Sequence, residues 1–137
     1  MAQEHMLDVE VLTPEGEVFS GEVRQLSTRT EVGEIGVLAN HAPVLGALRP
    51  TTLRLKVSDS ETKSWAQSHG WLQVYANTAR VLVEEVVAPE DLDAGALKEE
   101  LSDAERRLSE SDPDSAEAAR ALKDKQRAEA FLNIAQR

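Results

Sequence analysis

The chain has 137 residues, of which 41% are hydrophobic and 29% charged, with a formal net charge of −10 and no cysteine. Its length suits one domain, or a modest domain with an appendage. The acidic charge disfavours nucleic acid as a partner, because such binding depends on clustered Lys and Arg, and the lack of cysteine excludes disulfides, thiolate metal sites and cysteine nucleophiles.

No apolar run approaches the ~20 residues that a membrane-spanning helix requires, so we expect no direct membrane insertion. The N-terminus from Met1 to Met6 is polar and includes Glu4. It lacks the apolar stretch of a secretory signal and the Arg-rich bias of an organelle transit peptide, which predicts a chain that begins here, in the cytoplasm.

The composition changes at Pro89. All thirteen valines, all seven threonines and six of the seven glycines precede residue 88, whereas residues 89–137 are rich in Ala, Glu, Lys, Arg and Leu. β-Branched side chains suit a pleated sheet, while Ala, Leu, Glu and Lys lose little freedom in a helix. We therefore predict a β-domain over residues 1–88 and a helical unit over residues 89–137.

Residues 7–11 and 53–57 alternate apolar and polar side chains, the period of half-buried strands. Further strand candidates cover residues 18–24, 25–30, 64–69, 71–76 and 79–86. Many short strands without helices between them predict an antiparallel β-sandwich or flattened barrel.

The stretch from Gly33 to Leu48 is less regular. It contains Gly33, Gly36, Asn40, His41, Pro43 and Gly46 among apolar residues. We interpret Gly33–Gly36 as a turn, and the whole stretch as an ordered loop or sheet end that presents a surface.

Two helices are expected after Pro89. The first opens near Asp91 or Asp93 and carries an apolar seam, and the second begins at Ser111-Asp112-Pro113-Asp114, which resembles a capping box. The seam of the first is Leu97, Leu101, Ala104 and Leu108; that of the second is Ala118, Ala121, Leu122, Ala128, Leu132 and Ala135, with Phe131 beside it. Their spacing predicts an antiparallel hairpin. A seam this rich in Ala buries little area, so the hairpin is either loosely held and able to extend, or permanently packed.

Catalytic motifs are missing from the sequence. There is no Walker A loop and no Gly-x-Ser-x-Gly, and His5, His41 and His69 are far apart. We interpret the acidic doublets Glu84-Glu85 and Glu99-Glu100 as solvated charges. The aromatic residues Trp65, Trp71 and Tyr75 favour core or interface packing, with a sugar-stacking platform as the alternative.

The run Gly33-Glu34-Ile35-Gly36-Val37-Leu38-Ala39-Asn40-His41-Ala42-Pro43, followed by Leu48-Arg49-Pro50, resembles the signature of the ATP synthase ε subunit family. Further matches are His69-Gly70-Trp71-Leu72-Gln73-Val74, Asn77, Val81-Leu82-Val83 and Leu92-Asp93. The resemblance covers essentially the whole chain. It departs from the family at Thr51 and His69, where glycines are usual.

The resemblance implies a non-catalytic rotor subunit of the central stalk, bound to the γ subunit and the c-ring on the cytoplasmic side of the membrane. It implies that the hairpin hinders ATP hydrolysis through transient contact with the α and β subunits. The residues implied to face the c-ring or γ are Glu34, Ile35, Gly36, Asn40 and His41. The basic residues implied to contact an acidic loop of β are Arg106, Arg107, Lys123, Lys125 and Arg127. The tail nevertheless carries thirteen acidic against eight basic residues.

Some family members bind ATP on the hairpin. Aligned on them, this chain keeps Asp93 and Arg127 but has Val87, Ala96, Asp103 and Phe131 where a Glu and three Arg would be needed. Because each charge-assisted contact is worth about 1.5–3 kcal/mol, we expect ATP binding to be weak or absent and no other cofactor.

Two other functions compete with the stalk subunit. One is a free-standing β-sandwich module that binds carbohydrate or peptide, with Trp65 and Trp71 as its platform. The other is an enzyme, which no nucleophile, metal cluster or phosphate loop in the sequence supports.

Overall fold

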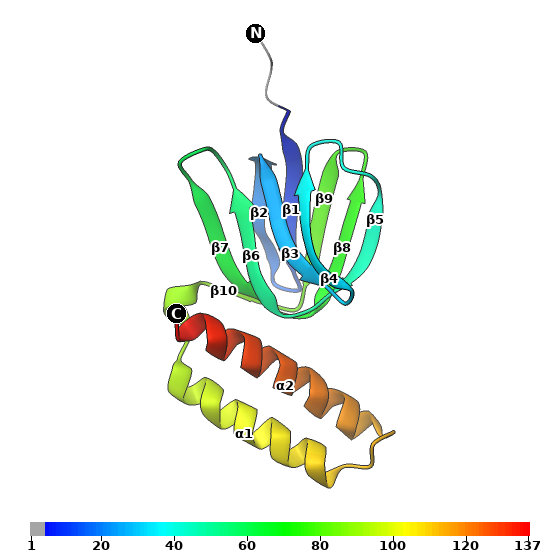
Figure 1. Ribbon diagram of the computed structural model, residues 1–137, viewed down its shortest axis with the longest axis vertical. Coiled ribbons are helices and arrows are strands. Elements are labelled where there is room, and N and C mark those ends of the chain that lie inside the picture. The colour runs from blue at the N-terminus through cyan, green and yellow to red at the C-terminus, as the bar shows by residue number, and fades with distance from the viewer. Residues whose placement is uncertain (1–4) are drawn as a thin grey trace. The chain divides into compact units, whose positions relative to one another are not determined.

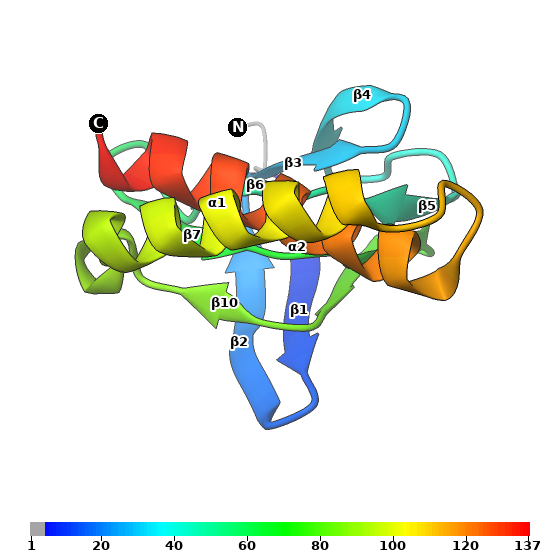
Figure 2. The same ribbon diagram turned by 90° about the horizontal axis from the view of Figure 1, so that it is seen from below.

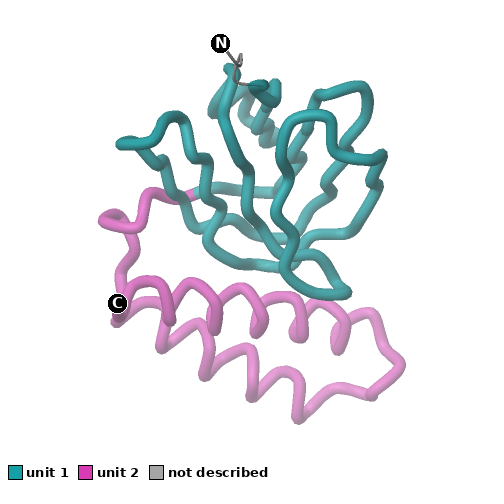
Figure 3. The backbone as a smooth tube through the Cα atoms, turned by 45° about the horizontal axis from the view of Figure 1, so that its top comes forward, with its two compact units in different colours: residues 1–86 teal, residues 87–137 magenta. Residues whose placement is uncertain are grey.

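A computed structural model describes residues 5–137, so the first four residues of the polar N-terminus lie outside the described part. The chain forms two compact units, one ending at Val86 and the other spanning Val87–Arg137 (Figure 3). The first consists of strands, and the second contains the helices.

The described residues form ten strands, and Figure 1 shows them curving around a common interior. They are β1 (Leu7–Thr13), β2 (Gly16–Val23), β3 (Gln25–Thr30), β4 (Gly33–Leu38), β5 (Val44–Leu48), β6 (Thr51–Lys56), β7 (Thr62–Gln67), β8 (Gly70–Tyr75), β9 (Thr78–Val83) and β10 (Val86–Val87). The predicted β-sandwich is confirmed.

The strands hydrogen-bond in the order β10-β7-β6-β3-β5-β8-β9-β1-β2, and β4 pairs with β3. Two layers result. We call β5, β8, β9, β1 and β2 the β8 sheet, and β4, β3, β6, β7 and β10 the β3 sheet. The two sheets are joined where Thr30 pairs with Leu48. β9, the last long strand, pairs with β1 in parallel, so the first and last long strands are neighbours in the sheet.

The sandwich interior is filled by alternate side chains of both sheets. In β1 the residues Leu7, Val9 and Val11 are buried, and in β6 Leu53 and Leu55 are buried, as the alternation predicts. Each fully buried Val or Leu contributes about 1.5–3 kcal/mol relative to leaving it exposed. The apolar interior is therefore enough to hold a domain of this size together.

The prediction for residues 33–48 is wrong in part. Gly33–Leu38 is the strand β4, paired with β3 along its whole length, and Val44–Leu48 is the strand β5, paired with β8. Only residues 39–43 between them form a connection. The predicted turn over residues 33–36 rested on the two glycines. Gly33 has φ +135° and ends the tight turn after β3, but Gly36 lies within the pleated strand β4.

Gly70 shows why the family pattern keeps glycine at the start of β8. A Cβ atom there would lie 1.9 Å from the carbonyl oxygen of Leu82 and 2.7 Å from the Cα of Val83. These are backbone atoms of the paired strand β9, which cannot move aside without breaking the ladder. His69, where the family usually has another glycine, lies just before Gly70, and β8 still pairs with β9 from Gly70 onward.

The second unit contains the 3₁₀ turn η1 (Pro89–Asp91) and the helices α1 (Ala94–Glu110) and α2 (Ala116–Ala135). The two helices lie side by side and antiparallel in both Figures 1 and 2. Asp93 caps α1 by accepting a hydrogen bond from the Ala96 N–H at 3.2 Å, and Ser115 caps α2 by accepting one from the Ala118 N–H at 3.1 Å. The predicted two-helix hairpin is confirmed.

The second helix begins later than predicted. Pro113 lies outside α2, because the Ser115 hydroxyl donates back to the Asp112 carbonyl at 2.7 Å and closes a turn before the helix. The seam also differs, since Leu122 is 44% exposed whereas Phe131 is fully buried. The buried tail residues are Leu97, Ala104, Ala118, Ala121, Ala128 and Phe131.

Candidate interaction surfaces

One end of the sandwich is built around two asparagines. Asn40 and Asn77 both have φ of +62°, a left-handed conformation that Asn tolerates better than most residues. The Asn77 side chain accepts a hydrogen bond from the Asn40 N–H at 2.8 Å and donates one to the Met6 carbonyl at 2.9 Å. We call this end the asparagine corner. It fixes the β4–β5 connection against the β8–β9 turn and the start of β1.

His41 follows directly in the asparagine corner. Its backbone N–H bonds to the Leu38 carbonyl at 3.2 Å, and its Nδ1 lies 2.7 Å from the Ala42 carbonyl. The side chain is half-buried. The corner therefore presents His41 on an ordered backbone, as a docking surface requires.

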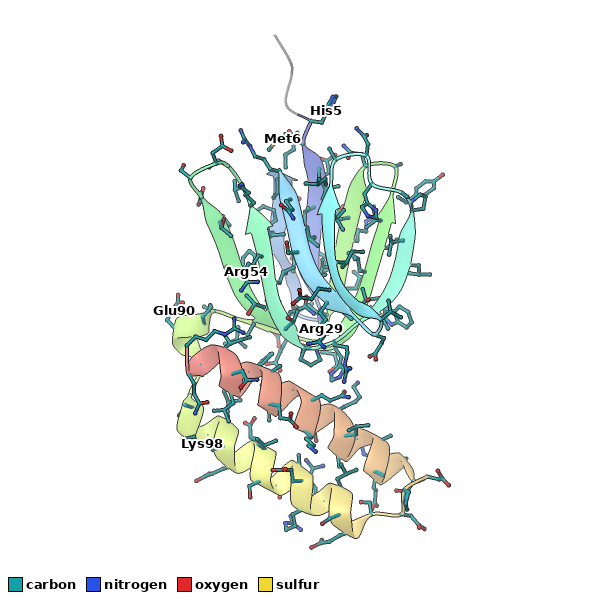
Figure 4. The ribbon with its side chains drawn as sticks, in the orientation of Figure 1. His5, Met6, Arg29, Arg54, Glu90 and Lys98 are labelled. Atoms are coloured by element: carbon teal, nitrogen blue, oxygen red, sulfur yellow. The ribbon has the colours of Figure 1, made fainter. Side chains whose placement is uncertain are left out.

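Glu34, Ile35 and Gly36 lie elsewhere. In the register of β3 and β4, Glu34 lies opposite Arg29. Figure 4 shows Arg29 near the end of the sandwich that is opposite to His5 and Met6. A six-residue strand spans roughly 17–20 Å, so Glu34 and His41 belong to separate surfaces. The three residues instead line a shallow hollow on the β3 sheet with Gln25 and Arg54, among others. Ile35 also packs against the core.

An apolar patch lies on the outer face of the β8 sheet. It consists of Leu45, Trp71, Tyr75 and Leu82, which are 75%, 54%, 67% and 41% exposed. Trp71 lies opposite Leu82, and Leu45 lies opposite Gln73, the residue between Trp71 and Tyr75 on the same face. Sequence reasoning missed this surface because β8 carries large apolar side chains on both faces, so its alternation does not reveal which face is exposed.

The two tryptophans do not form a shared platform. Trp65 in β7 packs against the core and makes an edge contact with Phe19, with ring centroids 6.2 Å apart. Trp71 belongs to the apolar patch on the other sheet. The suggested sugar-stacking pair is therefore wrong.

The predicted basic residues of the hairpin are engaged with acidic side chains. Arg106 donates to Asp103 at 2.7 Å and to Glu110 at 3.1 Å, all within α1. Arg107 donates from Nε to Asp103 at 2.9 Å and from an Nη atom to Asp124 of α2 at 2.8 Å. The hydrogen bonds from Arg106 and Arg107 lower the pKa of Asp103 below its usual value.

The other predicted cations lie on α2. The Nζ atom of Lys125 lies 3.9 Å from a carboxylate oxygen of Glu129. Lys123 is exposed and takes part in an interaction of its own. Arg127 donates to Glu100 of α1 at 2.9 Å and sits 4.6 Å from the centre of the Phe131 ring. The arginines are thus arranged for contact with carboxylates, and the carboxylates named here belong to the hairpin itself.

The residues predicted to remain from an ATP site are not gathered into one. Asp93 serves as the cap of α1, and Arg127 is paired with Glu100. The groove between the helices is lined by Glu100, Asp103, Arg107, Asp124 and Arg127, so three carboxylates occupy it. With three carboxylates against two arginines the lining is net negative, which opposes the binding of a nucleoside triphosphate.

Residues 5–137 show no candidate metal centre. In this range no cluster of His, Cys, Asp and Glu is suited to a metal ion, and each buried side-chain nitrogen or oxygen has a hydrogen-bond partner. No helix within the described range is long and apolar enough to span a membrane.

Residues 6–89 match the family described as ATP synthase, Delta/Epsilon chain, beta-sandwich domain. The ATP synthase epsilon chain of Persephonella marina is 38% identical over 131 residues, covering 95% of this chain and 96% of that protein. The epsilon chain of Sulfurihydrogenibium sp. is 35% identical over 130 residues, covering 95% and 97%.

The fold is shared with solved structures at lower identity. A chain in the Euglena gracilis mitochondrial ATP synthase assembly with OSCP and the c-ring aligns with a TM-score of 0.80 at 21% identity, covering all of this chain and 84% of that chain. A chain in the central stalk and c-ring structure from Tetrahymena thermophila aligns with a TM-score of 0.67 at 16% identity, covering 98% and 99%. The resemblance noted in the sequence is confirmed, and the protein belongs to the ATP synthase delta/epsilon family as an epsilon chain, a non-catalytic subunit of that complex.

Proposed function

We propose that this epsilon chain is a rotor subunit of the central stalk, which couples the catalytic head of a proton-translocating ATP synthase to the membrane c-ring. The epsilon chains of Persephonella marina and Sulfurihydrogenibium sp. match along nearly their full length, and the two structural neighbours come from ATP synthase assemblies that include the c-ring. In this role the chain sits peripherally on the cytoplasmic side of the membrane.

The single observation that best supports a docking role is the apolar patch. Monomeric proteins rarely leave contiguous large apolar side chains in water, and exposed Trp and Tyr are typical anchors of protein interfaces. The patch lies on the outer face of a five-stranded layer, which suits a broad contact with another folded subunit. We assign the patch to the γ subunit.

We assign the asparagine corner, with Asn40 and His41, to the c-ring. β9 begins beside Asn77, in the asparagine corner, and ends at Val83, at the other end of the sandwich. The chain continues toward the tail from that other end, so the connection does not cover the asparagine corner. Glu34, Ile35 and Gly36 lie near the other end, so their role is a separate contact, which we assign to γ.

We also propose that the helical tail inhibits ATP hydrolysis, by extending toward the α and β subunits and offering its basic residues to an acidic surface of β. Arg107 and Arg127 already show the pairing that this requires, because each binds a carboxylate on the opposite helix. The small apolar content of the seam supports a tail that can rearrange.

We infer that the tail has no physiological ATP site. The retained Asp93 and Arg127 are engaged elsewhere, and Asp103 brings a negative charge to the groove where an arginine would be needed. Titration calorimetry of the full-length chain with ATP is expected to give no binding at micromolar concentrations. A micromolar dissociation constant would contradict the inference.

The γ assignment is tested by binding tagged γ subunit to the full-length chain and to the variants Trp71→Ser and Leu45→Ser. Loss of a central interface anchor costs 2 kcal/mol or more, so we expect affinity for γ to fall at least about tenfold. The matched control is Val18→Ser, because Val18 is an exposed apolar residue of β2 that lies outside the patch and outside the surface of Glu34, Ile35 and Gly36.

Binding of both patch variants at the affinity of the unmodified chain would show that γ docks elsewhere. Failure of the unmodified chain to bind γ in mild salt would contradict the proposed function as a whole.

A further inference from the structure

Two ion pairs join α1 to α2 in a reciprocal arrangement. Arg107 of α1 binds Asp124 of α2 at 2.8 Å, and Arg127 of α2 binds Glu100 of α1 at 2.9 Å. Each helix thus supplies one arginine and one carboxylate. We call these four residues the interhelical clamp.

Both arginines are held in place before they reach across. Asp103 accepts a hydrogen bond from the Nε of Arg107, which leaves an Nη atom free to reach Asp124. Arg127 stacks on the Phe131 ring at 4.6 Å while it donates to Glu100. A guanidinium that is already oriented loses less freedom when it forms its next hydrogen bond, so these pairs have better geometry than typical surface ion pairs.

The buried apolar surface of the tail is rich in alanine. Four of its six buried residues are Ala104, Ala118, Ala121 and Ala128, each with only a methyl group to bury, and the other two are Leu97 and Phe131. Stabilisation from burial is proportional to apolar area, so these alanines contribute less than leucines would at the same positions. The ion pairs therefore have a larger share in holding the two helices together than they would beside a leucine-rich seam.

We propose that the interhelical clamp is the lock of the hairpin, and that the hairpin opens by exchange of carboxylates. In the closed state Glu100 and Asp124 occupy Arg127 and Arg107. An acidic surface on a partner competes with the internal carboxylates for those arginines, so contact with the partner weakens the clamp and favours opening of the hairpin. The link to inhibition depends on the proposed function, whereas the lock itself is a property of the isolated chain.

The clamp also makes closure sensitive to ionic strength. Its four side chains are between 28% and 57% exposed, so salt screens their attraction. The buried alanines do not respond in this way. Rising salt is thus expected to open the hairpin.

The test measures the separation of α1 and α2 in the full-length chain. Because the protein has no cysteine, Glu99→Cys and Asn133→Cys introduce a single pair of thiols on exposed positions of the two helices, and spin labels there report the distance between them. The clamp variant is Glu100→Gln with Asp124→Asn, and the control is Glu110→Gln, which removes a pair within α1. Helical circular dichroism is recorded in parallel, to show that the helices persist.

We expect the clamp variant to raise the population of long distances about threefold or more, and high salt to do the same in the unmodified chain. The control should match the unmodified distribution. Identical distributions for the clamp variant and the control would overturn the proposal.

A charge swap provides a second test that does not depend on simple loss of a contact. Glu100→Arg alone should open the hairpin by placing two arginines together, and adding Arg127→Glu should close it again. Failure of the second change to restore short distances would overturn the lock. The measurement needs no γ subunit, so its outcome is independent of whether the chain binds the rotor.

Discussion

At the scale of single residues, the helices of the hairpin are joined by ion pairs between side chains that are far apart in the chain. Arg127 and Glu100 are 27 residues apart and Arg107 and Asp124 are 17 residues apart, separations that a local sequence pattern does not record. Trp65 and Trp71 show the same limit. They are six residues apart, and one packs against the core while the other is half-exposed on the opposite sheet.

Asp103 accepts hydrogen bonds from both Arg106 and Arg107, and the effect of these bonds on its pKa can be tested. The hydrogen bonds from Arg106 and Arg107 lower the pKa below the ordinary 3.8. A carboxyl group whose pKa is lower in the folded state stabilises that state above its unfolded pKa, and the contribution disappears as the pH falls through the folded value. The stabilisation should thus be complete at neutral pH and vanish in acid below pH 3.8.

The measurement is thermal unfolding of the full-length chain, followed by helical circular dichroism at neutral pH and in strong acid. Asp103→Asn should melt its helices at lower temperature than the unmodified chain at neutral pH, and the difference should close in acid. Asp112→Asn, in the connection between the helices, serves as control. A difference that persists unchanged in acid would mean that the carboxylate charge of Asp103 is not its cause.

At the scale of elements, the strands with a simple alternation were predicted to within two residues at each end. β3 was expected over residues 25–30 and occupies that range, and β1 buries the three side chains that its alternation assigns to the interior. The strands β4 and β5 were missed because Gly36 and Gly46 interrupt the side-chain pattern while the backbone continues to pair. Backbone pairing is a long-range property, which local composition does not record.

For the helices, composition predicted that they exist, but the start of α2 was predicted too early. That start depends on which of several nearby residues acts as the N-cap. Pro113 after Ser111 and Asp112 is a good local start signal, yet Ser115 provides the cap and the preceding residues form a turn. Leu122 was placed on the inner stripe because it is apolar, although the alanines and Phe131 define the buried direction.

At the scale of the whole molecule, the change in composition near Pro89 reflects a physical division. Val87 and the residues after it form a unit of their own, while the short strand β10, at Val86–Val87, completes the edge of the β3 sheet beside β7. The sandwich has its own apolar core and its buried polar side chains are satisfied, so it does not require the helices for its fold. This division suits the proposed function, in which the sandwich docks and the tail regulates.

The division yields a prediction for the assembled enzyme. A chain that stops after Ala88 keeps β10, and with it the edge of the β3 sheet, but lacks both helices and the interhelical clamp. Because the apolar patch and the asparagine corner lie in the retained part, we expect it to fold and to bind γ with the affinity of the full-length chain. If the tail is inhibitory, ATP hydrolysis by complexes reconstituted with the truncated chain should rise severalfold over complexes with the full-length chain, at equal occupancy measured by quantitative gel analysis. An unchanged hydrolysis rate at equal occupancy would refute inhibition by the tail and leave the docking role standing, whereas loss of γ binding would refute the independence of the sandwich.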